Sequence, residues 1–213
     1  MKQIKSTGIV FGDMHFPLHD EKAFSCALKV IEKVKPDVFI NLGDFAEGEY
    51  VSHWRWSRRK RPPLEYQLPL IDKEADEVNY HLDRIDKALK KVGCKKKYLA
   101  MGNHDAWYNA FVEENPYLDK YKPETLFDIE KRGYKWFPYG EIFKVEDSKL
   151  YAYHGGHYGS VNHSRATVQN LGCNIIYGHT HDCQRSVVQH ISGVHIAQSM
   201  GCLCKIKKDF LKG

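Results

Sequence analysis

The sequence has no apolar stretch long enough to span a bilayer and no charged-then-apolar start typical of a signal peptide. None of its six cysteines forms a Cys-x-x-Cys pair. We therefore expect a cytoplasmic protein with free thiols and no membrane partner, since disulfides are rare in reducing compartments. Cys202 and Cys204 have one residue between them. We interpret them as neighbours at a strand end, with metal binding as the alternative.

Internal repeats and low-complexity segments are also absent. The hydrophobic content of 42% and the charged content of 28% are typical of a globular domain. A chain of 213 residues buries roughly 70% of its unfolded surface, so it needs no disulfide or structural zinc for a core. We predict one domain over residues 1–213, with an irregular insertion at about 46–70. The net charge of +5 is too mild to indicate a partner, and the oligomeric state is left open.

The first half of the chain alternates between short apolar runs and amphipathic segments. Strands are predicted over 7–12, 37–42 and 97–101, and helices over 21–34 and 72–91. An alternating order of strands and helices favours parallel strands joined by helical crossovers.

The second half of the chain is richer in predicted strands. Helical segments within 106–135 are expected to be interrupted at Pro116 and Pro123, and a further helix is predicted over 161–171. Residues 146–148 are expected to form a hairpin turn. The predicted strands cover residues 141–146, 149–154, 173–177, 184–190 and 194–199.

Five short polar clusters occur along the chain, most of them where a predicted strand ends. Each places Asp, Asn or His beside a glycine, which permits unusual backbone angles. Taken singly, each cluster is explained by a turn or a helix cap, but together they supply carboxylate, imidazole and carboxamide ligands suited to borderline divalent metals. The clusters are Gly12-Asp13-Met14-His15, Gly43-Asp44, Gly102-Asn103-His104-Asp105, His154-Gly155 and Gly178-His179-Thr180-His181.

The order of these five clusters resembles the signature of the calcineurin-like metallophosphoesterase superfamily over about residues 7–200. The resemblance implies an α/β fold, namely a four-layer α/β sandwich of two mixed β-sheets flanked by helices. It also implies a dinuclear metal site at the C-terminal ends of the strands.

The resemblance further implies seven metal ligands in two sets that share one carboxylate. It implies catalytic roles for His104, near the scissile phosphate, and for Asp105, as a partner behind the metal ligands. An alternative role for His104 is to orient Asn103. The first set of ligands is Asp13, His15 and His181, the second is Asn103, His154 and His179, and Asp44 bridges the two.

The expected cofactors are two divalent metal ions. Mixed oxygen and imidazole ligands suit Mn²⁺, Fe²⁺, Zn²⁺ or Ni²⁺ better than an all-oxygen Mg²⁺ site, and we favour Mn²⁺. The expected reaction is hydrolysis of a phosphate ester by a hydroxide shared between the metals, because coordination lowers the pKa of water from 15.7 to about 7.

A basic and aromatic segment at residues 53–63 bears on the substrate. It holds five basic residues in the seven positions 55–61. We predict that Trp54, Arg55 and Arg58 bind substrate, since cations contact phosphates and aromatic rings stack on bases. A nucleotide or a single-stranded nucleic acid is therefore the favoured partner. The alternative is a solvated loop that its tryptophans attach to the body of the protein.

Two departures from the serine/threonine protein phosphatase branch narrow the function. Phe16 follows His15 where that branch has glycine, and the cluster at Asp44 continues without the phosphate-binding arginine. We therefore predict a compact, nuclease-like phosphodiesterase. The alternatives are a phosphomonoesterase, a non-catalytic scaffold of the same fold and a nucleic-acid-binding module. The complete set of candidate ligands argues against the scaffold.

Overall fold

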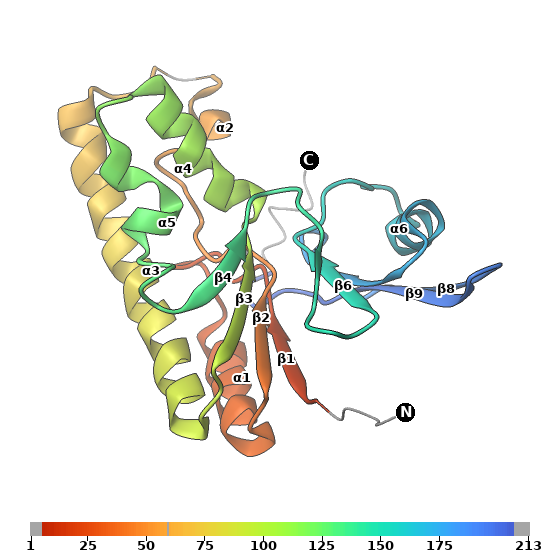
Figure 1. Cartoon of the computed structure of the whole chain (residues 1–213). Coiled ribbons are helices and arrows are strands. Elements are labelled where there is room, and N and C mark those ends of the chain that lie inside the picture. Colours follow the sequence, from red (N-terminus) through yellow and green to blue (C-terminus); the bar gives the residue numbers. More distant parts are fainter. Residues whose placement is uncertain (1–5, 59, 207–213) are drawn as a thin grey trace.

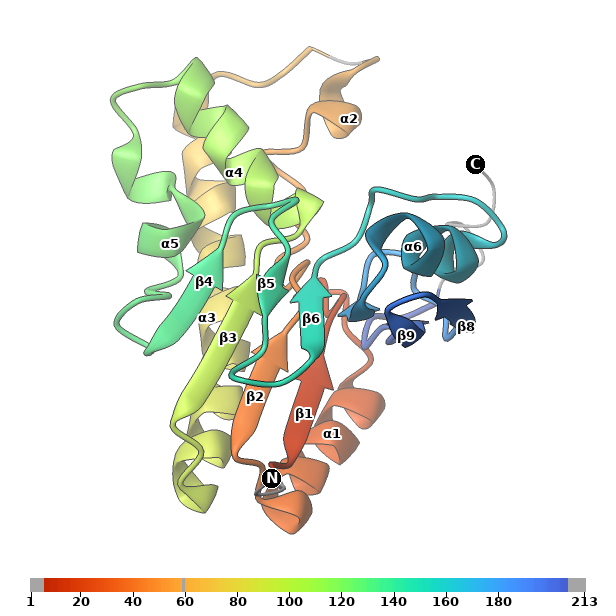
Figure 2. The same ribbon diagram turned by 45° about the vertical axis from the view of Figure 1, so that its right-hand side comes forward.

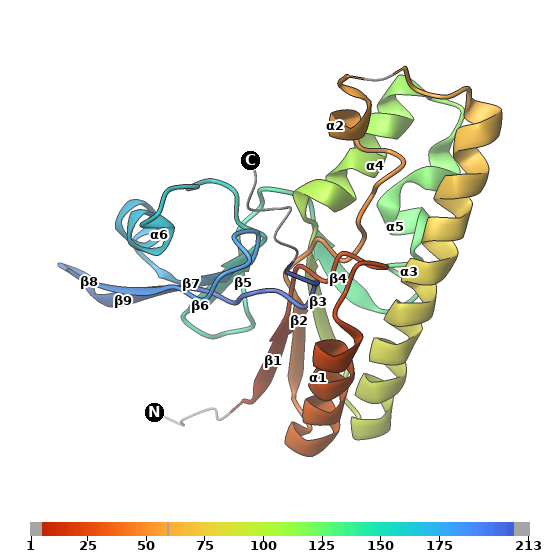
Figure 3. The same ribbon diagram turned by 180° about the vertical axis from the view of Figure 1, so that it is seen from behind.

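The computed structural model describes residues 6–58 and 60–206. Two β-sheets pack against each other, and helices cover the outer face of each (Figures 1 and 3). The predicted α/β fold with two sheets flanked by helices is confirmed. Three separate hydrophobic clusters lie between the successive layers of this arrangement.

The first sheet has the order β1-β2-β3-β4, and all of its strands are parallel. The prediction that both sheets are mixed is therefore wrong for this one. A helical crossover follows each of its first three strands, and crossovers of this length return the chain in the same direction. The strands are β1 (Gly8–Phe11), β2 (Val38–Asn41), β3 (Lys96–Ala100) and β4 (Tyr134–Phe137).

Three helices of the first half cover one face of this sheet, namely α1 (Glu21–Val34), α3 (Leu64–Val92) and α4 (Asn103–Glu114). The short α2 (His53–Trp56) has no buried residue and lies beside α4 (Figures 1 and 3). The predicted N-cap of α1 is confirmed, because the Asp20 carboxylate accepts hydrogen bonds from the amides of Lys22 and Ala23 at 2.9 and 3.0 Å.

The helix predicted over 72–91 begins earlier than expected, and the segment 46–70 is only partly irregular. Its prolines indicated a break, yet Pro63 directly precedes α3 and Pro69 lies near its start. Proline is best tolerated in the first turns of a helix, where few intrahelical bonds are lost. Burial of Gln67 and Ile71 on the inner face of α3 stabilises these early turns.

The second sheet has the order β5-β6-β7-β9-β8 and is mixed, as expected. Its central strands β6, β7 and β9 are parallel, while β5 and β8 pair antiparallel at the edges. Helix α6 (His163–Leu171) covers its outer face (Figure 2). The strands are β5 (Phe143–Lys144), β6 (Leu150–Tyr153), β7 (Asn174–Tyr177), β8 (Arg185–His190) and β9 (Gly193–Ser199).

The chain between β3 and β5 contains the strand β4, which the sequence prediction missed. The predicted interruptions are confirmed: α4 ends before Pro116, and α5 (Pro123–Leu126) begins at Pro123, after the short helix η1 (Asp119–Tyr121). Strand β4 follows at once and was hidden by the helical prediction for 106–135. Its aromatic residues after a glycine, at Tyr134 and Trp136, were the available signal.

Alternation along the strands distributes side chains between the layers. In β2, Phe39 faces the helices, while Val38 and Ile40 face the second sheet. In β3, Leu99 and Ala100 divide in the same way. Because successive side chains point to opposite faces, the apolar run of β2 serves both interfaces, and its polar residues begin only at Asn41.

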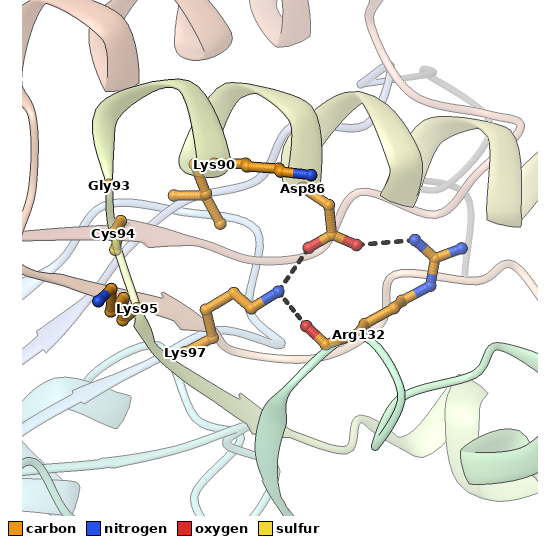
Figure 4. A pocket seen from close by; sticks show the side chains of 8 residues that line it. Asp86, Lys90, Gly93, Cys94, Lys95, Lys97 and Arg132 are labelled. Atoms are coloured by element: carbon orange, nitrogen blue, oxygen red, sulfur yellow. Dashed lines mark hydrogen bonds and ion pairs between the residues drawn. The ribbon is translucent and has the colours of Figure 1, made fainter.

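A cavity of about 390 Å³ lies near the amino end of β3, away from the carboxyl ends of the strands where the polar clusters lie (Figure 4). There the Lys97 ammonium donates to the Asp86 carboxylate at 2.8 Å, and Arg132 pairs with the same carboxylate at 2.7 Å. These contacts join α3, β3 and the turn before β4. None of the five polar clusters lines this cavity.

No helix among residues 6–58 and 60–206 is long and apolar enough to cross a membrane. All six cysteines are free thiols, as expected.

A buried carboxyl on α3 supports the loop that follows β2. Glu74 is 5% exposed, and its Oε1 accepts a hydrogen bond from the amide of Glu49 at 3.2 Å. Burial, together with the nearby charge of Glu47, raises the pKa of Glu74 to about 7. The folded protein therefore holds a proton on Glu74 at pH values where the unfolded chain releases it.

This difference in pKa predicts a pH-dependent contribution to stability. The contribution is complete below pH 4.5 and is lost as the pH rises to about 7, and it amounts to about 3 kcal/mol. We expect Glu74→Gln to gain on the wild type by that amount in free energy of unfolding between pH 4 and 8, measured by urea denaturation. Glu65→Gln, on an exposed position of the same helix, is the control and should keep a constant difference. A constant difference for Glu74→Gln would contradict the assignment.

Candidate metal centre

The loops after five strands of both sheets meet at one edge of the molecule, and Figure 2 shows the carboxyl ends of β1, β2 and β6 side by side. These loops carry the residues of the five polar clusters. Strand ends distant in the sequence therefore converge, as predicted. The first ligand candidates after β1, β2, β3, β6 and β7 are Asp13, Asp44, Asn103, His154 and His179.

The structure brings the first predicted ligand set together. The Nε2 atoms of His15 and His181 are 3.1 Å apart. The Nε2 of His181 is also 3.4 Å from Oδ1 of Asp13. Asp13 and His15 are buried, whereas His181 is partly exposed. One side of this set is therefore open to solvent.

The second predicted set is equally compact. The Asn103 side-chain oxygen is 3.1 Å from Nε2 of His154 and 2.9 Å from Nδ1 of His179. The two imidazole nitrogens are 3.3 Å apart. Helix α4 begins at Asn103, so the start of that helix fixes where the carboxamide points.

The carboxylate of Asp44 lies between the two sets. Its Oδ2 is 3.7 Å from Nε2 of His15 and 3.4 Å from Nε2 of His154. Its Oδ1 accepts a hydrogen bond from the amide of His104 at 2.9 Å. One oxygen of a single side chain thus faces a ligand from each set.

The donor set fits divalent metal ions. Nδ1 of His15 donates to Glu47 at 2.9 Å, and Nδ1 of His154 donates to the carbonyl of Leu42 at 2.6 Å. With Nδ1 committed in this way, each ring in its neutral form presents the lone pair of Nε2 to the centre. Ligands that bind one cation at about 2.0–2.2 Å lie about 2.8–3.6 Å apart, close to the spacings found here.

The buried carboxylates of Asp13 and Asp44 require a compensating positive charge at the centre. Burial alone would raise the pKa of Asp44, but His154, His104 and His15 hold it well below its usual value. Burial opposes protonation of His154, yet the Asp44 charge raises the pKa of this histidine to about 9. A proton on an imidazole or a cation between the ligands balances the carboxylates.

Five of the seven predicted ligands have left-handed backbone. Positive φ at residues other than glycine is uncommon, although Asp, Asn and His adopt it several times more often than other residues. The neighbouring Gly43 and Gly155 also have positive φ, at 91° and 120°, as expected, and several of the predicted ligands adopt it as well. The φ values are 51° at Asp13, 48° at His15, 47° at Asp44, 70° at His179 and 58° at His181.

Two glycines permit the close approach of the carboxylates. A Cβ on Gly102 would lie 2.0 Å from Oδ1 of Asp44, and one on Gly178 would lie 2.3 Å from Oδ2 of Asp13. Any side chain at either position would displace a predicted ligand. Glycine is therefore required at these two positions by space, since neither has a positive φ.

Asp105 lies behind the predicted ligand Asp44, in the position that the family resemblance implies. Its carboxylate is fully buried and accepts hydrogen bonds from the amides of Asp44 and Gly102 at 2.8 Å and of Ala46 at 3.3 Å. Burial and the adjacent Asp44 charge raise the pKa of Asp105 to about 7. Asp105 ties the loop after β2 to the start of α4 and positions Asp44.

His104 lies beside the ligands with one ring nitrogen left for a substrate. Its Nδ1 donates to the carbonyl of Glu47 at 2.6 Å, and its ring centroid is 4.5 Å from that of His15. Burial and the nearby His15 lower the pKa of His104, against the opposing Asp44 charge. Its other face packs on Trp107, with the ring centroids 3.9 Å apart.

Sequence analysis missed Glu47 and Asp182, and it favoured a strand-end position for Cys204 over the metal-binding alternative. Glu47 holds both His15 and His104, and the available signal was a carboxylate so soon after Asp44. Asp182 accepts hydrogen bonds from Thr180, Ser199 and His163 at 2.8–3.0 Å and so supports the loop with His179 and His181. The Cys204 sulfur is 3.7 Å from Nδ1 of His181. Apart from the contact between Thr180 and Asp182, these contacts join segments far apart in the sequence.

The three predicted substrate residues lie on or just after α2. Trp54 is 68% exposed, and Arg58 is exposed. Arg55 pairs with Glu49 and lies over the ring of Tyr50, 5.2 Å from its centroid, so its charge is already compensated. No hydrogen bond or ion pair joins these three residues to the seven predicted ligands within residues 6–58 and 60–206.

No curated protein matches this chain. A model of the calcineurin-like phosphoesterase family matches residues 9–183, a range that contains all seven predicted ligands and His104. Because this match covers most of the sequence, the chain belongs to the calcineurin-like phosphoesterase family.

Proposed function

We propose that this protein hydrolyses phosphodiesters with two divalent metal ions, and that its substrates are nucleotides or single-stranded nucleic acids. Membership of the family carries the general activity, metal-dependent hydrolysis of phosphate esters. The position of Asp44 Oδ2 between two complete ligand sets is the observation that best supports a dinuclear centre.

The seven ligands would hold the two metals in the sets described above, with Asp44 common to both. Bound there, the ions supply Lewis acidity to the phosphoryl oxygens and lower the pKa of water. The mixed oxygen and imidazole donors favour Mn²⁺. Glu47 and the carbonyl of Leu42 keep His15 and His154 in the tautomer that binds a metal.

His104 is the candidate general acid. Because Nδ1 is committed to the carbonyl of Glu47, Nε2 is the atom that faces the substrate. A protonated ring would give its Nε2 proton to the leaving oxygen. Contact with Trp107 on one face restricts rotation of the ring, so little motion is needed at the moment of transfer.

The charge around the centre favours a diester over a monoester. A phosphate monoester carries about one more negative charge at neutral pH, and Glu47 adds a carboxylate close to the ligands. Gly48 stands where the protein phosphatase branch has its phosphate-binding arginine. The extra charge of a monoester therefore meets repulsion without a compensating guanidinium.

Removing the imidazole of His104 should separate chemistry from metal binding. We expect His104→Ala to keep its metal content but to lose about 10²–10⁴-fold in kcat on bis-p-nitrophenyl phosphate, because general acid catalysis typically contributes that much. Metal content is measured by atomic emission. His190→Ala, an exposed histidine in β8, is the control. Loss of metal together with activity would instead favour the role of orienting Asn103.

The shared carboxylate predicts unequal effects of two ligand substitutions. Metal-stripped wild type should be inactive and should recover with Mn²⁺, binding two ions per chain in equilibrium dialysis. Asn103→Ala should lose binding at one site, whereas Asp44→Asn should weaken both, because only Asp44 faces both sets. Asn170→Ala, on the exposed side of α6, is the matched control. Retention of two tight sites in Asp44→Asn would refute the bridging role.

A substrate panel tests the ester class. We expect faster hydrolysis of bis-p-nitrophenyl phosphate than of p-nitrophenyl phosphate, and activity on single-stranded DNA or RNA. The KM for single strands should rise with salt, with a slope of about 0.7 per contacted phosphate in a logarithmic plot. Preference for the monoester would establish the phosphomonoesterase alternative, and a flat salt response would exclude a nucleic-acid substrate.

A further inference from the structure

A row of four aromatic rings leads from the metal centre to the exposed helix α2, which lies beside α4 (Figures 1 and 3). It begins at His104, whose ring centroid is 3.9 Å from that of Trp107. The His53 ring follows 6.1 Å from Trp107, with its edge toward the indole. Trp54 ends the row, 4.5 Å from His53. The row thus joins the reaction centre to the insertion after β2.

The inner end of this row is firmly held. His104 is anchored through Glu47, and Trp107 packs against Gly48, where an added Cβ would lie 3.4 Å from the indole. Trp107 comes from α4, the helix that also begins with Asn103. Its position relative to the ligands is therefore fixed by one rigid element.

The outer end of the row is exposed, and cations follow it in the sequence. Trp54 exposes 68% of its surface, an unusual state for the largest apolar side chain. Arg58 and Lys60 follow in the chain and are exposed. Arg55 has a different role, since it pairs with Glu49 and stacks 5.3 Å from the centroid of Trp56. Arg55 therefore stabilises the segment itself, whereas Trp54, Arg58 and Lys60 are exposed and available to a partner.

We propose that this aromatic row is a binding subsite for the unpaired bases of a single-stranded nucleic acid whose phosphodiester lies at the metal centre. The inference rests on the proposed function. Flat rings stack on bases of any sequence, and the neighbouring Arg58 and Lys60 attract the backbone phosphates. Duplex DNA hides the faces of its bases, so the subsite distinguishes single strands from duplexes.

Binding of a fluorescein-labelled thymidine 12-mer to the full-length protein, followed by anisotropy in EDTA to prevent cleavage, tests the subsite. We expect Trp54→Ala to weaken binding about 5- to 100-fold, the effect of losing one stacked base. Trp54→Phe, which keeps a ring, should recover most of the affinity. Tyr80→Ala removes an aromatic residue that is 59% exposed on α3 and should bind as the wild type does.

The same protein samples separate failure of the subsite from failure of the proposed function. A wild type that hydrolyses bis-p-nitrophenyl phosphate, together with Trp54→Ala that binds the 12-mer normally, would overturn the subsite alone. A wild type that binds the 12-mer through Trp54 but hydrolyses no ester would overturn the proposed function alone. Equal loss of affinity for a 12-base-pair duplex would exclude base stacking and leave Trp54 as a contact for another class of partner.

Discussion

The predicted metal centre depends on the contacts of Asp44, whose carboxylate lies between the two predicted ligand sets. Its carbonyl accepts a hydrogen bond from the amide of His15 at 2.8 Å, and its own amide donates to Asp105. Its carboxylate receives the amide of His104 and faces an imidazole from each ligand set. One residue therefore fixes the loops after β1, β2 and β3 relative to one another. Displacing it would separate both sets at once.

This arrangement has a cost that the rest of the fold must offset. Buried lone pairs and carboxylates repel one another at these distances, and five ligands have left-handed backbone, a strain of about 1–3 kcal/mol per residue. The ligands also come from both sheets. The apolar interface between the sheets, with Ile40, Leu42 and Ala152 buried in it, therefore sets the distance between the two halves of the centre. The packing of the two sheets therefore maintains the distances between the predicted ligands.

The insertion after β2 connects the predicted metal centre with the surface of the protein. Its start supplies Glu47, which holds two histidines of the centre, and its later part forms α2. Within it the charges are not equivalent: Arg55 is compensated by Glu49, while Arg58 is exposed. Because Trp107 lies between His104 and His53, the insertion and the centre are in contact through α4. The insertion and the predicted metal centre are therefore linked by a single helix.

The sequence by itself determined the order of strands and helices, the parallel crossovers of the first half and the five polar clusters, because periodicity and local motifs are properties of neighbouring residues. It did not reveal β4, since Tyr134–Phe137 is short and follows helical segments, or the early start of α3, since Pro69 looked like a break. Only the tertiary structure decided that Asp105 binds the amides of Asp44 and Gly102, that Glu47 and Cys204 contact predicted ligands, and that Arg55 is already paired. The physical reason is the same in each case. Where a side chain points, and which distant group it meets, depends on how the sheets pack and not on the residues beside it in the chain.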